Sequence, residues 1–99
     1  MKYKLTANGS TAALNFSGAC DIYFSGVFAG AKIAIETSPP AGDATWRAIG
    51  ESIGEASEIT AATMAQIQRI GRCRLRFTLS EADATTDVDV EVVNWADLG

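Results

Sequence analysis

Strict alternation of apolar and polar residues in the C-terminal third constrains the fold of this chain more than any other feature. Arginines and a threonine alternate with apolar residues from Arg72 to Leu79, and acidic residues alternate with valines from Asp87 to Val92. Residues two positions apart lie on one face of a β-strand, so each segment predicts a strand with one buried and one solvated face. The same pattern recurs between Gly, Pro, Asn and Asp clusters along most of the 99 residues and predicts an all-β chain.

The predicted order of elements follows from these clusters. Asn8-Gly9 is expected to make a hairpin turn. Pro39 and Pro40 lack backbone donors and place a loop at 38–43. The segment 55–64 suits either a helical turn or extended chain, and we favour a loop with a short strand. Upstream of the two C-terminal strands, we expect strands at 3–7, 12–16, 20–25, 31–37, 45–49 and 65–70.

The two C-terminal segments also predict their own register. If 80–86 forms the turn of an antiparallel hairpin, Arg76 lies opposite Asp89 and Arg74 opposite Glu91. The same register places Phe77 beside Val88 and Leu75 beside Val90, so one pairing satisfies both the apolar and the charged face. We therefore predict a structural charge ladder of Arg74, Arg76, Asp89 and Glu91.

Length and the absence of an internal boundary indicate one domain over residues 1–99. Short alternating strands separated by turn residues are typical of sandwiches and barrels. We predict a single, mostly antiparallel β-sandwich of the Ig-like or jelly-roll-like kind.

Composition weighs against several classes of function. A net charge of −4 opposes binding to nucleic acid, and no apolar run is long enough for a membrane span, so neither partner is expected. Histidine is absent, which removes the commonest general base and metal ligand. We predict no enzyme activity, no cofactor and no metal.

A few residues suggest less favoured alternatives in which the chain binds an anion or a metal or uses a reactive thiol. Arg72, Arg74 and Arg76 could hold an anion, although pairing with the acidic strand is the favoured interpretation. Cys20 and Cys73 lie among apolar neighbours, as buried reduced thiols do. Carboxylates along 87–91 could bind calcium only with a wrapping loop, which a strand does not supply.

Surface contacts are the remaining route to function. An apolar and basic terminus and a stiff proline loop suit docking, and tryptophan is favoured at binding sites. Core packing of Trp46 is an equal alternative to exposure. The predicted interface residues are Met1, Lys2, Tyr3, Lys4, Pro39, Pro40, Trp46 and Trp95.

The stretch from Phe24 to Ser38, followed by Gly42-Asp43-Ala44-Thr45-Trp46, resembles a group of small bacteriophage virion proteins. In those proteins a Gly-aromatic-x-Gly-Ala turn leads into an alternating strand, a loop and a tryptophan. The resemblance spans roughly residues 16–93 and implies a decoration or cement protein of the capsid, or a head-to-tail or tail protein. It implies assembly in the bacterial cytoplasm, location in the virion and no catalytic residues.

We therefore expect a non-enzymatic virion protein that binds and stabilises the head lattice. Its expected partners are the major capsid protein, other virion proteins and sister copies in a dimer or trimer. Two other classes remain as alternatives. A carbohydrate-binding or adhesin module would stack sugars on Tyr23, Trp46 or Trp95, and a small enzyme would use paired carboxylates.

Overall fold

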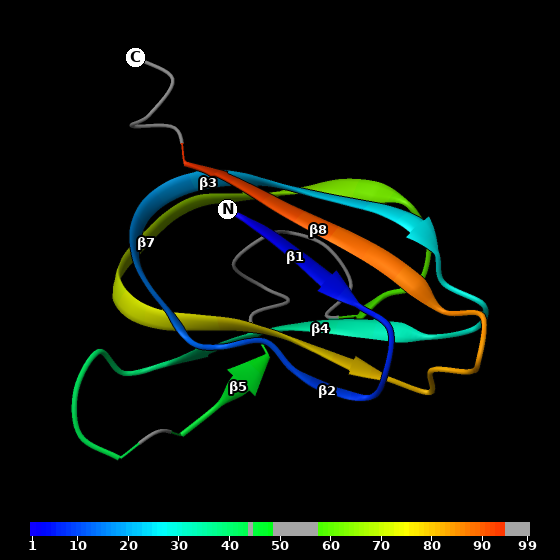
Figure 1. Cartoon of the computed structure of the whole chain (residues 1–99). Coiled ribbons are helices and arrows are strands. Elements are labelled where there is room, and N and C mark those ends of the chain that lie inside the picture. Colours follow the sequence, from blue (N-terminus) through cyan, green and yellow to red (C-terminus); the bar gives the residue numbers. More distant parts are fainter. Residues whose placement is uncertain (44, 49–57, 95–99) are drawn as a thin grey trace.

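A single antiparallel sheet of eight strands makes up the computed structural model, which describes residues 1–43, 45–48 and 58–94, with backbone alone for 68–70 (Figure 1). The described residues contain no helix, so the predicted all-β class is confirmed. The strands are β1 (Lys2–Leu5), β2 (Gly9–Ser10), β3 (Leu14–Val27), β4 (Lys32–Ser38), β5 (Arg47–Ala48), β6 (Glu58–Ile59), β7 (Thr63–Ser80) and β8 (Asp87–Asn94).

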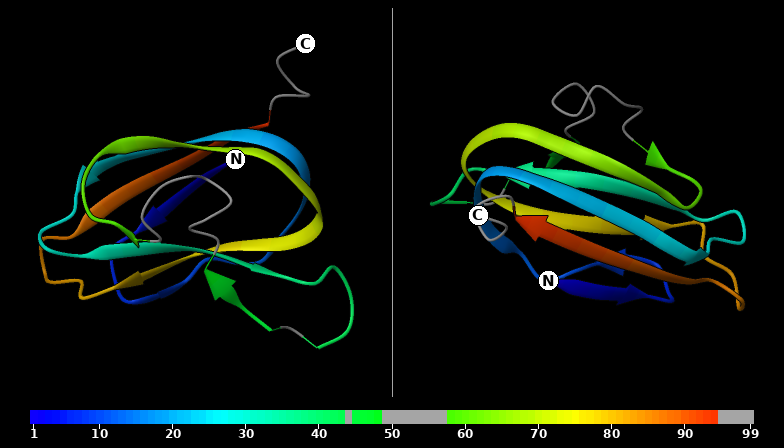
Figure 2. Two further views of the ribbon diagram at one scale, coloured as in Figure 1. Left: turned by 180° about the vertical axis from the view of Figure 1, so that it is seen from behind. Right: turned by 90° about the horizontal axis from the view of Figure 1, so that it is seen from above.

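Two long strands, β3 and β7, form the centre of this sheet. Hydrogen-bonded neighbours follow the order β1-β8-β3-β7-β4-β5, with β2 also paired to β7 and β6 to β4. Both long strands curve strongly at the same end of the molecule, so the sheet folds back on itself (Figures 1 and 2). The β3–β7 register shifts on either side of Gly18, whose φ of 95° favours glycine. Gly18 therefore lies where β3 passes from one half of the sheet to the other.

The bend divides the sheet into two arms. The first arm contains β1, β8, the part of β3 from Cys20 to Val27 and the part of β7 from Thr63 to Ile67. The second arm contains β2, β4, β5, β6, the start of β3 and the part of β7 from Cys73 to Ser80. Each arm presents one apolar face to the other, because period-two alternation continues through the long strands.

The hydrophobic core lies between the two arms. Phe77 of the second arm is 1% exposed, and its ring centroid lies 6.2 Å from that of Phe24 and 5.8 Å from that of Tyr3 in the first arm. The predicted inward residues are buried, which confirms the face of every alternating strand. They are Cys20, Ile22, Phe24, Ile33, Ile35, Cys73, Leu75, Phe77, Leu79, Val88, Val90 and Val92.

The predicted hairpin between the two C-terminal strands is wrong. β7 pairs with β4, where Arg76 lies opposite Glu36, and β8 pairs with β3 and β1, where Asp89 lies opposite Ser25 and Lys4. The connection 81–86 crosses from the second arm to the first instead of making a turn. Buried Thr86 anchors this crossing, because its hydroxyl donates to the carbonyl of Phe28 at 3.2 Å. The alternation determined which face is buried, but not which strand is the neighbour.

The strand boundaries also differ from those predicted. Asn8-Gly9 is not a hairpin turn, because β1 pairs with β8 while β2 pairs with β7, so this segment crosses between the arms. The strands expected at 12–16 and 20–25 are one continuous strand, as are those at 65–70 and 72–79. A short strand, β6, lies within the ambiguous segment, of which 55–57 are outside the described residues.

We predict that Gly26→Ala destabilises the fold far more than Gly30→Ala. Both glycines have positive φ, 98° and 84°, but a Cβ at Gly26 would overlap the backbone carbonyl of Asp87, whereas one at Gly30 meets nothing within 4 Å. Left-handed strain alone costs about 1 kcal/mol, and the overlap adds about 2 kcal/mol more. Urea unfolding of the two variants and the wild type measures this difference, and equal losses would contradict it.

Candidate binding surface

The proline loop, described at residues 39–43 and 45, is held against the second arm by hydrogen bonds to β7 and β4. Arg74 of β7 donates from Nε to the carbonyl oxygen of Pro39 at 2.7 Å and from Nη2 to that of Gly42 at 3.0 Å. Ser38, the last residue of β4, is 3% exposed, and its Oγ accepts a hydrogen bond from the amide of Thr45 at 2.9 Å. These contacts fix both ends of the loop while Pro39 and Pro40 remain exposed.

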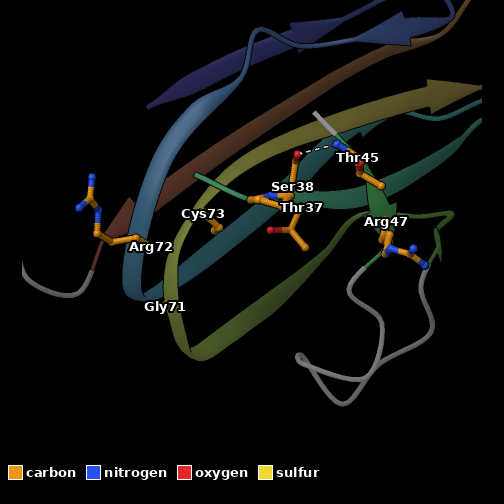
Figure 3. A pocket seen from close by; sticks show the side chains of 8 residues that line it. Thr37, Ser38, Thr45, Arg47, Gly71, Arg72 and Cys73 are labelled. Atoms are coloured by element: carbon orange, nitrogen blue, oxygen red, sulfur yellow. Dashed lines mark hydrogen bonds between the residues drawn. The ribbon is translucent and has the colours of Figure 1, made fainter. Parts of the chain in front are cut away.

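An open cavity of about 550 Å³ lies between this loop and the bend of β7. Thr37, Ser38 and Thr45 line it, and Arg47 and Arg72 extend on opposite sides of it (Figure 3). A second cavity of about 280 Å³ shares Arg72 and Cys73 with the first and is also lined by Pro40. We call the two cavities together the loop groove.

The arginines at the loop groove have two kinds of environment. Arg74 is engaged by the loop carbonyls, whereas Arg47 and Arg72 are exposed and have no ion-pair partner among the residues that the structure describes. An unpaired guanidinium offers planar donors that match carboxylate or phosphate oxygens. Arg72 therefore remains a candidate for binding an anion, which the sequence raised as an alternative. Arg74 instead donates its hydrogen bonds to the loop.

Trp46 lies in a polar cluster on the outer face of the second arm. The guanidinium of Arg76 stacks 4.2 Å from the Trp46 ring centroid, and its Nε donates to Glu36 at 2.8 Å. The hydroxyl of Thr78 donates to the same carboxylate oxygen. Trp46 is half-buried, so it is neither a core residue nor a freely exposed anchor. The contact with Arg76 occupies one face of the ring on which a sugar would otherwise stack.

The N-terminal segment forms the edge strand of the first arm. The α-amino group of Met1 donates to the carbonyl oxygen of Val92 at 2.9 Å, and the amide of Val92 donates back to Met1 at 2.7 Å. Met1, Lys2 and Lys4 are exposed, and Tyr3 is half-buried against Phe77. Only one side of β1 is paired in the described sheet, so β1 is an edge strand of that sheet.

The predicted charge ladder is not formed. Lys4 lies 2.9 Å from Asp87 and 3.3 Å from Asp89, and hydrogen bonds to these two carboxylates raise its pKa. Glu91 lies opposite Lys2 and Tyr23 in the register. Arg74 and Arg76 instead interact with the loop and with Glu36, because β4 and not β8 is the neighbour of this part of β7.

The predicted interface residues thus fall into two separate regions. Met1, Lys2, Tyr3 and Lys4 belong to β1, while Pro39, Pro40 and Trp46 belong to the loop and its flank. Trp95 lies outside the described residues. Sequence reasoning missed Arg47, although a cation directly after a proline loop and a tryptophan is a recognisable pattern. Whether either region is an interface stays a prediction.

The two cysteines are free and buried in the core. Burial raises the pKa of the Cys20 thiol from 9.0 to about 11. A thiol that stays protonated is a poor nucleophile and a poor metal ligand. No group of three His, Cys, Asp or Glu side chains that could hold a metal ion occurs within the described part of the chain. Nor do these residues include a helix long and apolar enough to cross a membrane.

Comparisons with protein-family models, with curated proteins and with solved structures give no match for this chain.

We predict that Glu36→Gln lowers the free energy of unfolding by about 1–2 kcal/mol, because it leaves the Arg76 guanidinium without its half-buried charged partner. The side chains of this pair are 27% and 20% exposed. In the matched pair of Lys32 and Glu81 the side chains are 40% and 61% exposed, so Glu81→Gln is expected to change stability by less than about 0.5 kcal/mol. Urea unfolding of both variants tests the contrast, and equal effects would contradict it.

We also predict that Cys20 makes the fold less stable in alkali. Its folded pKa of about 11 exceeds the ordinary 9.0, so the unfolded state releases the thiol proton first as the pH rises. The contribution of the protonated Cys20 thiol to the free energy of unfolding is complete below about pH 9 and is lost progressively towards pH 11. The free energy of unfolding, measured against pH for the wild type and Cys20→Val, checks this prediction, because the part of the alkaline decline that comes from Cys20 should be missing in the variant. Parallel curves for the two proteins would show that Cys20 does not cause the decline.

Proposed function

We propose that this chain is a non-enzymatic binding domain that docks on a protein partner through its proline loop and loop groove. The observation that carries the proposal is the Arg74 clamp, in which one guanidinium holds the carbonyl oxygens of Pro39 and Gly42. It gives an exposed loop a defined shape before any partner binds.

A preformed loop supports binding because ordering a flexible segment on association costs free energy. Pro39 and Pro40 restrict the backbone further, and Ser38 fixes the point where the loop leaves β4. The cavity of about 550 Å³ beside the loop offers a recess for a partner side chain, with Thr37 and Thr45 among its lining residues. These features suit recognition of another protein surface.

We assign this binding role to a bacteriophage virion, as a capsid decoration or cement protein, with a head-to-tail or tail protein as the alternative. The support is the resemblance at Phe24 to Ser38 and Gly42 to Trp46. These residues form the end of β3, the crossing to β4, β4 itself and the described part of the loop, and Thr37, Ser38 and Thr45 among them line the loop groove. The two arms with a core between them suit a β-sandwich, and we propose that class for the fold.

The experiment uses purified virions of the phage that encodes the chain and particles assembled without it. Cryo-microscopy of the virions is expected to show the folded sheet on the particle with the loop at the contact. Sedimentation with the deficient particles measures the affinity of added protein. Virions that contain no copy of the chain would overturn the virion role.

We predict that Arg74→Met weakens this binding at least tenfold. Without the clamp, ordering the loop on association costs about 1.5 kcal/mol or more. The matched control is Lys32→Met, which removes a cation at the opposite end of β4, where Lys32 pairs with Glu81. The control should bind like the wild type. Circular dichroism confirms that both variants are folded. Unchanged affinity of folded Arg74→Met would show that the loop is not the docking element.

A further inference from the structure

The outer face of the first arm carries an excess of negative charge. Among the side chains that the structure describes, two lysines lie on this face against four carboxylates, namely Lys2 and Lys4 against Asp21, Asp87, Asp89 and Glu91. Lys4 lies between Asp87 and Asp89 and neutralises only part of their charge. We call this surface the acidic face.

Exposed apolar side chains lie beside the carboxylates of the acidic face. Tyr23 is 45% exposed and Met64 43%, and the register places them side by side on β3 and β7. Glu91 lies on the other side of Tyr23, and Lys2 lies beyond it at the edge. A hollow of about 370 Å³ is bordered by residues of this row. Exposed tyrosine and methionine next to charged residues are enriched at protein interfaces relative to the rest of a protein surface.

The loop groove has the opposite charge. Arg47, Arg72 and Arg74 surround it, and Asp43 is the carboxylate that the described part of the loop contributes. Arg47 and Arg72 are exposed and have no described ion-pair partner, and exposed Pro39 and Pro40 supply apolar surface next to them. The chain therefore holds an arginine-rimmed apolar recess in one place and an acidic face with adjoining apolar side chains in another.

We infer that these two surfaces bind each other between copies, with the acidic face of one copy on the loop groove of the next. Charge complementarity favours this occupant, since each surface supplies what the other lacks. The contact joins two different patches, so it is heterologous, and each pair of copies leaves one patch of each kind free. Such a contact continues into a closed ring or an open chain.

The net charge of −4 sets a condition on this contact. Whole molecules repel one another, so association depends on the local attraction between arginines and carboxylates. That attraction is screened at high ionic strength. Self-association should therefore be present at low salt and disappear at about 1 M salt, where the Debye length is about 3 Å.

The test uses two variants, each blocked at one surface. Arg47→Glu with Arg72→Glu reverses the charge of the loop groove at two exposed residues without described partners. Tyr23→Arg with Ser25→Arg blocks the acidic face, and the new cations lie opposite Glu91 and Asp89, so the folded state is not penalised. Thr60→Glu with Ala84→Glu adds carboxylates at exposed residues outside both surfaces and serves as the control.

Sedimentation equilibrium at low salt gives the masses. The wild type and the control should form oligomers that grow with concentration, and each blocked variant alone should be a monomer. An equimolar mixture of the blocked variants should associate, because the intact groove of one variant meets the intact acidic face of the other. A monomeric wild type, assembly of either blocked variant alone, or a mixture that stays monomeric would overturn the inference.

This inference rests on the proposed function in using the loop groove as a docking region, but the two fail separately. A wild type that is monomeric in solution yet binds deficient particles through the loop would overturn the head-to-tail contact alone. A wild type that assembles as described while virions contain no copy of the chain would overturn the virion role alone.

Discussion

The pairing of β3 with β7 through a common bend is the constraint on which the rest of the structure depends. Both strands pass through both arms, so their register determines which residues face the core in either arm. Gly18 interrupts the ladder at the bend and allows the change of direction. In the folded sheet β8 pairs with the side of β3 that β7 leaves free, β1 pairs with β8, and β4 pairs with the other side of β7.

This arrangement decides how the charged residues are used. Because β4 is the neighbour of the second half of β7, Arg76 meets Glu36 and Trp46, and Arg74 reaches the loop that follows β4. The acidic residues of β8 meet Lys4 on the edge strand instead. The arginines and carboxylates that the sequence pattern predicts to pair within one hairpin therefore lie on different arms. As a result, the acidic and the arginine-rich surfaces are separate.

The separation of these surfaces connects the fold with the proposed functions. A clamped loop flanked by exposed arginines suits a partner that presents carboxylates, and the acidic face of a second copy is such a surface. Binding of this kind needs rigid geometry more than reactive groups, and the folded sheet supplies it through a continuous core in which Phe77 contacts aromatic rings of the other arm.

The sequence by itself determined the all-β class, the buried face of each strand and the proline loop. Period-two burial is a local property, so Ile33, Leu75 and Val90 could be assigned to the core without knowledge of any neighbour. Strand partners are not local, since Leu75 has the same parity whether β8 or β4 lies beside it. Only the tertiary structure decided that the segments around Asn8 and Thr86 pass from one arm to the other, and therefore that Arg74 clamps the loop. The choice depends on closing two arms around one core, which no single segment encodes.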